Sequence, residues 1–200
     1  MMEEQEKKEL AKSISYIVKE LSKQEKEQDK ILGSVRQIVR CCANAIRLIH
    51  TRKIAEAERE IADAEREIAK FARTKKFEYL LLQPYQEIAE ARLLLAAVQK
   101  KQLPSWKNLK MPFEPYLLGL CDFVGELRRE MLEMLKQEEL AEAERYFELM
   151  SEIHEHLQTI RFSNSLLPNF KKKQDVVRMQ MEQARSELVI AKISRNLKKG

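Results

Sequence analysis

The stretch EIAEARLLLAAV, residues 87–98, has the composition of a helix that is buried on most of its surface. Its only charged side chains are Glu87, Glu90 and Arg92. At helical spacing Glu87 and Glu90 lie one turn apart, and only apolar residues continue that side of the helix. We therefore expect a buried helix with two carboxylates, each of which needs a cation, a hydrogen bond or a proton.

A second acidic pair, Asp122 and Glu126, lies four residues apart in a stretch that also reads as a helix. The two acids are on the side opposite an apolar stripe, so they share one face. Acidic pairs on helices usually form salt bridges, and three arginines are available as partners: Arg92, Arg128 and Arg129. A divalent metal ion would instead satisfy all four carboxylates at once, provided that the tertiary structure brings the two pairs together.

The composition of the whole chain predicts an all-α fold in a single domain, residues 1–200. Only four glycines and five prolines occur among 200 residues, and Ala, Glu, Leu, Lys, Arg and Gln recur at helical periods. No stretch approaches the roughly twenty apolar residues of a membrane span, and the first ten residues are highly charged. We expect a cytoplasmic protein that does not enter a membrane. Its net charge of +5 favours a nucleic-acid partner.

The pattern along the chain predicts about six or seven helices. Apolar residues step by three and four from Ile14 to Ile49, which implies one first helix of nearly fifty residues. Thr51 is a candidate N-cap for a second helix, and Pro84 fits the first turn of a third. Residues 100–112 form a clear loop, and three further helices are expected at about 114–136, after residue 137, and from about residue 168.

Two clusters of basic and aromatic residues are candidate nucleic-acid contacts. The first surrounds the start of the last helix, where Arg161 precedes a run of lysines: Lys171, Lys172 and Lys173. Three lysines there oppose the helix dipole, so an external phosphate is a reasonable partner, although a solvated lysine run is equally compatible. The second cluster, KFARTKKFEY at residues 70–79, combines cations with aromatic rings that either stack on bases or belong to the core. His50 stands alone at a helix end and receives no role.

Residues 113–129, FEPYLLGLCDFVGELRR, resemble the signature of the translin family, and most closely its translin-associated factor X branch. The shared pattern is an aromatic residue, Leu-Leu-Gly, two residues, Asp, two residues, Gly-Glu-Leu and a basic residue. Upstream, QEIAEA at residues 86–91 is similar to the Glu-x-x-Glu-Ala segment of that branch. These motifs cover about thirty residues, while the long first helix and the all-helical order extend the resemblance over most of the chain.

The resemblance implies a translin-like helical bundle that assembles into a closed, hollow shell of roughly eight identical subunits, an octamer. It also implies binding to single-stranded RNA, with single-stranded DNA and duplex RNA as further ligands. The factor X branch supplies an endoribonuclease site that depends on Mg²⁺, and its acidic ligands map onto Glu87, Glu90, Asp122 and Glu126. An all-oxygen ligand set is what Mg²⁺ or Mn²⁺ prefers. Arg128, Arg129, Arg161 and the three lysines would hold the RNA backbone.

Three hypotheses follow for the function. The first is a metal-dependent endoribonuclease that acts on single-stranded RNA within a closed homo-oligomer. The second is a shell of the translin type that binds RNA or single-stranded DNA without catalysis. The third is a helical scaffold that pairs with another coiled-coil protein through the first and last helices, because apolar seams alone do not choose between self-assembly and a foreign partner.

Overall fold

The computed structural model describes residues 4–71 and 74–197 of the chain. These residues form six α-helices and one short 3-10 helix, and they contain no β-strand. The elements in order are α1 (Glu4–His50), α2 (Ile54–Ala69), η1 (Glu78–Leu81), α3 (Leu82–Val98), α4 (Phe113–Lys136), α5 (Leu140–Gln158) and α6 (Phe170–Leu197). The expected all-α fold with a very long first helix is confirmed, because α1 alone has 47 residues.

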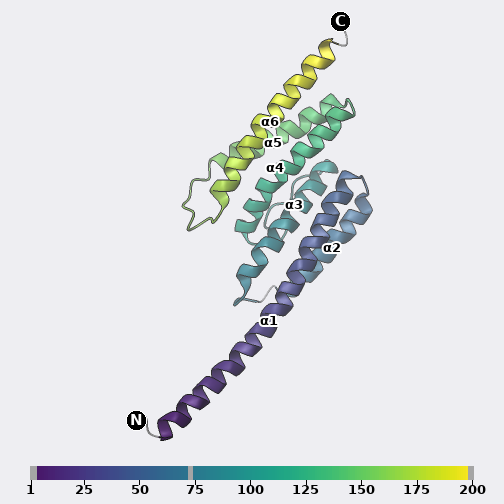
Figure 1. Cartoon of the computed structure of the whole chain (residues 1–200). Coiled ribbons are helices and arrows are strands. Elements are labelled where there is room, and N and C mark those ends of the chain that lie inside the picture. Colours follow the sequence, from purple (N-terminus) through teal and green to yellow (C-terminus); the bar gives the residue numbers. More distant parts are fainter. Residues whose placement is uncertain (1–3, 72–73, 198–200) are drawn as a thin grey trace.

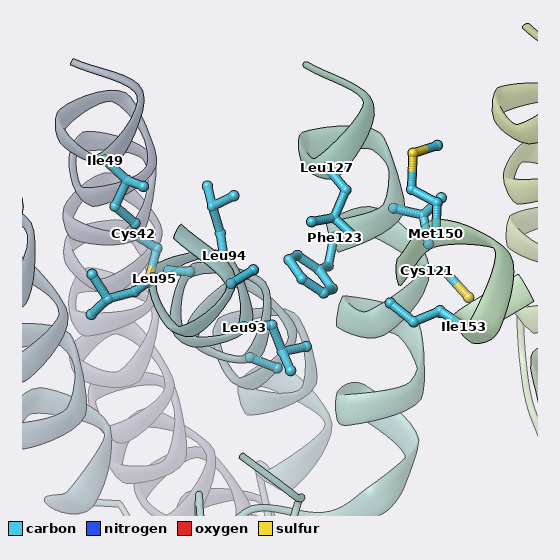
Figure 2. Close-up of a cluster of buried hydrophobic side chains, with 14 of the residues drawn as sticks. Cys42, Ile49, Leu93, Leu94, Leu95, Cys121, Phe123, Leu127, Met150 and Ile153 are labelled. Atoms are coloured by element: carbon cyan, nitrogen blue, oxygen red, sulfur yellow. The ribbon is translucent and has the colours of Figure 1, made fainter. Parts of the chain in front are cut away.

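Helix α3 lies at the centre of the molecule, between α1 on one side and α4 on the other (Figure 1). It is buried on nearly all sides, as its apolar sequence predicted. Leu93 and Leu94 have no exposed surface, and Phe123 and Leu127 of α4 are equally buried. Figure 2 shows these side chains in one hydrophobic cluster with residues of α1 and α5. Burial of this apolar surface is the main stabilising contribution to the bundle.

Two helices extend beyond the bundle at opposite ends (Figure 1). The N-terminal part of α1 carries a stripe of half-exposed apolar residues, and the C-terminal part of α6 carries another. The stripe on α1 comprises Leu10, Ile14, Ile17 and Leu21. Nearer the start of α6, the apolar residues Val177 and Met181 are buried against the rest of the bundle. The α1 stripe therefore has no apolar partner within the described residues.

The helix positions agree with the expectations, except for the predicted N-cap at Thr51. The structure also decides whether the aromatic residues of the second basic cluster belong to the core. Thr51 does not cap α2, because Lys53 occupies the N-cap position. The Thr51 hydroxyl instead donates to two carbonyl oxygens in the last turn of α1, which leaves that turn satisfied. In the second aromatic cluster Phe71 and Phe77 are buried in a small core with Ile31, so they are core residues and do not stack on bases.

Candidate active site

The two acid-bearing helices, α3 and α4, approach each other closely at Gly119. A Cβ atom added there would lie 2.6 Å from the carbonyl oxygen of Gln86 and 2.9 Å from Cβ of Ala89. Both distances are shorter than a real Cβ contact, so only glycine allows this approach of the backbones. The contact lies between Gln86 and Glu90 on α3, and Asp122 follows one turn after Gly119 on α4. Gly119 thus brings the two acidic pairs together.

The four carboxylates influence one another electrostatically, most visibly at Glu90. Burial raises the pKa of Glu90, and the charges of Asp122, Glu87 and Glu126 raise it further, to about 8. Glu87 also has a raised pKa, because burial and the charge of Asp122 outweigh the opposing effects of Lys173 and a hydrogen bond to Gln83. These mutual effects mean that the two pairs lie within electrostatic reach of each other across the contact of α3 with α4.

Asp122 is held by two side chains from other helices. Gln86 of α3 donates from Nε2 to Oδ2 of Asp122 at 2.6 Å. Lys173, in the first turn of α6, donates from Nζ to Oδ1 of the same carboxylate. Of the run of three lysines, Lys173 is therefore the one that enters the site, where its charge partly offsets that of the acids.

Glu126 belongs to a hydrogen-bonded chain that begins with His50 at the end of α1. The two ring nitrogens of His50 contact Glu126 and Glu130, and Nδ1 lies 2.6 Å from Oε1 of Glu130. Arg52 completes the chain by donating to the other oxygen of Glu130 at 2.6 Å. Glu130 is the one buried charged residue among the described residues, with 1% of its surface exposed. His50 and Arg52 thus supply the partners that a buried carboxylate requires.

The pKa shifts of His50 and Glu130 favour the charged form of both side chains. Burial alone would lower the pKa of His50, but its hydrogen bonds to Glu126 and Glu130 outweigh burial, so the pKa is raised. Burial alone would raise the pKa of Glu130, yet the hydrogen bonds from His50 and Arg52 lower it. A protonated His50 donates from both nitrogens and so holds the carboxylates of Glu126 and Glu130 in place.

Sequence reasoning missed His50 and Glu130. His50 is 76 residues from Glu126, and no spacing rule links residues so far apart. Glu130 did carry a local signal, since it lies four residues after Glu126 on the same helical face. The arginines considered as partners are mostly engaged elsewhere: Arg92 binds Glu65 at 2.6 Å, and Arg128 binds Glu187 at 3.0 Å.

The donor chemistry of the site suits a divalent ion that prefers oxygen ligands. The pKa of Glu90 is raised by burial and by the charges of the other three carboxylates, which a divalent ion would offset. In the conformation described, Asp122 is held by Lys173 and Glu126 by His50. Over residues 4–71 and 74–197, no group of three or more His, Cys, Asp or Glu side chains is arranged to hold a metal ion. Metal binding would therefore require these two acids to exchange their protein partners for the ion.

The residues expected to contact the RNA backbone lie in three places. Arg129 is 60% exposed and its Nη1 lies 3.7 Å from Glu126, at the edge of the site. Arg161 and Lys171 line a separate cleft of about 410 Å³ between α5 and α6. Lys172 is exposed on α6. In the second basic cluster, Arg73 lies outside the described residues.

Comparisons with known proteins agree on one family. Residues 5–189 match the sequence model of the translin family. An uncharacterised protein of Methanocaldococcus jannaschii is 33% identical over 181 residues, which are 88% of this chain and 81% of that protein. The crystal structure of AfC3PO superposes with a TM-score of 0.83 at 28% identity, over 92% of this chain and 98% of that one.

Two further solved structures are similar. AfC3PO in complex with duplex RNA gives the same TM-score, identity and coverage as AfC3PO alone. The crystal structure of apo-NeC3PO has a TM-score of 0.79 over 89% of this chain and 96% of that chain. Its identity of 18% supports similarity of fold only. No helix among the described residues is long and apolar enough to cross a membrane.

Proposed function

Because this chain belongs to the translin family, we propose that its four-acid site is the centre of a metal-dependent endoribonuclease that acts on single-stranded RNA. The observation that carries the proposal is the convergence of Glu87, Glu90, Asp122 and Glu126 across the contact of α3 with α4. Such a cluster is costly to bury. A purely structural role would need only pairs of acid and base, whereas the half-buried Glu90 lies in the field of three other acids, two of which are partly exposed.

The four carboxylates would hold Mg²⁺ or Mn²⁺, which supplies a Lewis acid for water activation and for the charge at the scissile phosphate. Glu90 is buried deepest of the four and faces the charge of the other three. Glu126 is oriented by His50, and Asp122 by Gln86. Lys173 stands at the edge of the same site, where its ammonium group is positioned to contact a phosphate oxygen once Asp122 binds the ion.

The expected substrate and assembly are supported by the relatives. AfC3PO, which shares the fold at 28% identity, has been solved with duplex RNA. We therefore propose RNA as the nucleic-acid partner, with unpaired RNA as the cleaved form and single-stranded DNA as a further ligand. The unpartnered apolar stripe on α1 supports a closed homo-oligomer of about eight subunits, because such an assembly would bury that stripe.

The experiment is cleavage of labelled RNA, both single-stranded and duplex, with Mg²⁺, with Mn²⁺ and with EDTA. The unmodified protein is compared with Glu90→Gln and Asp122→Asn, and with Glu133→Gln as a control on the same helix away from the site. We expect metal-dependent cleavage that falls at least about 100-fold in the two site variants and is unchanged in the control. Size-exclusion chromatography checks that each variant still assembles.

A second candidate function is an RNA- or DNA-binding oligomer without catalysis. It is favoured by the protein partners that Asp122 and Glu126 already have, since Lys173 and His50 stabilise these acids without a metal. This function predicts RNA binding that weakens steeply with salt and cleavage that is absent, or is equal in Glu90→Gln and the unmodified protein. Either cleavage result would overturn the nuclease proposal.

A further inference from the structure

A cleft of about 630 Å³ opens beside the four-acid site, at the N-terminal ends of α3 and α4. Its volume is within the range of small-molecule sites. Its wall includes Gln83 and Gln86 of α3. Gln86 donates to Asp122, and Gln83 forms a hydrogen bond with Glu87. Since these two side chains belong to both the wall and the acid site, an occupant of the cleft would lie next to the four carboxylates.

The charge of the cleft argues against a phosphate as its occupant. Among the described residues that line it, there is no Lys, Arg or His. Its charged residues are two acids, Glu78 and Glu114, which would repel a phosphodiester. The basic groups near the site lie elsewhere, with Lys173 at Asp122 and Arg129 at Glu126. The RNA backbone would therefore follow these cations, while the cleft suits a neutral group.

Two side chains specify what kind of neutral group fits. Glu114 is half-buried in the first turn of α4, and within the described part of the chain no hydrogen bond or ion pair to its carboxylate is found. Its carboxylate oxygens are therefore available to accept hydrogen bonds from a group bound in the cleft. Tyr79 also lines the cleft, with 59% of its surface exposed. A flat ring beside an unpaired acceptor suits a base that carries an amino group.

We propose that this cleft binds one unpaired base of the RNA strand beside the four-acid site, and that Glu114 selects bases with an amino group over uracil. The proposal rests on the proposed RNA substrate. Cytosine, adenine and guanine each present an amino group that donates to a carboxylate. Uracil has no amino group: only its N3–H can donate to the carboxylate, and the two carbonyl oxygens beside that N–H are repelled by an acidic wall. Tyr79 supplies stacking for any base.

The test is binding in EDTA, measured by fluorescence anisotropy, of a short oligouridine and of the same strand with central cytidines or adenosines. We expect the substituted strands to bind the unmodified protein at least about fivefold more tightly than oligouridine. In Glu114→Gln the preference should fall within about twofold, because an amide also donates to uracil oxygens. Glu133→Gln, on the same helix but outside the cleft, should keep the preference. Tyr79→Ala should weaken the binding of every strand by about tenfold without changing the order of their affinities.

Equal affinity of the unmodified protein for all strands would overturn the proposal, and so would a preference that persists in Glu114→Gln. The binding measurement does not depend on catalysis, so the two proposals can fail separately. A base preference without cleavage removes the nuclease and keeps the base-binding cleft. Metal-dependent cleavage without a base preference keeps the nuclease proposal and removes the base-binding cleft. Failure to bind any strand removes both the nuclease and the cleft proposals.

Discussion

At the scale of single residues, Glu90 is the most informative group in the molecule. Its carboxyl group is partly buried near three other acids, and its pKa of about 8 means that it holds a proton at pH values where an ordinary glutamate is ionised. The opposite case is Glu130, which is more deeply buried yet has a lowered pKa because His50 and Arg52 are its partners. Glu130 has two direct partners, whereas the three acids around Glu90 raise its pKa more than the charge of Lys173 lowers it.

The raised pKa of Glu90 predicts how stability depends on pH. Below about pH 4.5 the group is protonated in both the folded and unfolded chain, so it contributes no difference. Between about pH 4.5 and pH 8 only the folded chain keeps the proton, so the free energy of unfolding falls as pH rises. Glu90→Gln removes this pH-dependent loss of stability. We expect the free energy of unfolding of the variant to exceed that of the unmodified protein by about 1–4 kcal/mol at pH 8.5 and to equal it near pH 4.5.

Urea unfolding at several pH values and a fixed chain concentration measures this difference, with Glu155→Gln on the surface of α5 as the control. Added Mg²⁺ should raise the melting temperature of the unmodified protein more than that of Glu90→Gln, because the ion replaces the proton. A stability difference that does not change with pH would show that Glu90 is not strained in this way.

At the scale of secondary-structure elements, the contact of α3 with α4 decides whether there is a site. The four acids of the site come from these two helices, and Gly119 allows the close approach of the two backbones. Helix α1 adds His50 at its end, and α6 adds Lys173 in its first turn. The four helices α1, α3, α4 and α6 therefore contribute to one group of charged side chains.

Gly119→Ala tests this contact, and Gly125→Ala is the matched control in the same helix. The methyl group at residue 119 would collide with the backbone of α3, so we expect a loss of about 1–3 kcal/mol in unfolding free energy. At residue 125 the methyl group enters open space, so we expect a gain of about 0.5–1 kcal/mol from helix propensity. Urea unfolding compares them, and similar effects of the two substitutions would contradict the close-approach argument.

At the scale of the whole molecule, the shape leaves apolar surface that a single chain does not cover. The stripe of Leu10, Ile14, Ile17 and Leu21 lies on the part of α1 that extends from the bundle (Figure 1). These four residues are each 48–57% exposed, which is unusual for a regular stripe of this length. The stripe is apolar surface that assembly of identical subunits would bury.

The double substitution Ile14→Asp with Leu21→Asp should break this assembly. Carboxylates on the stripe would be desolvated in a subunit contact, so we expect the mass to fall from about eight times 23.6 kDa to smaller species. Light scattering after size exclusion measures the mass, and circular dichroism checks that the helices persist. Ser22→Asp, about 110° around α1 from the stripe, is the control. An unchanged mass in the double variant would place the subunit contacts elsewhere.

The sequence by itself determined the helices and both acidic pairs. Their periodicity is local, because residues three or four apart share a helical face whatever surrounds them. The same reasoning placed α3 in the interior and the long helix α1 at the start. It was wrong at Thr51, where two helix ends compete for one hydroxyl, and it left the aromatic residues Phe71 and Phe77 undecided between core and surface.

Only the tertiary structure decided which groups meet at the site. Glu90 and Asp122 come together because two helices pack at Gly119, a contact that no local pattern of either helix specifies. Lys173 is 51 residues from Asp122, and His50 is 76 residues from Glu126. Such pairs follow from how the apolar faces of whole helices fit one another, and the charged groups at their edges are brought together as a consequence.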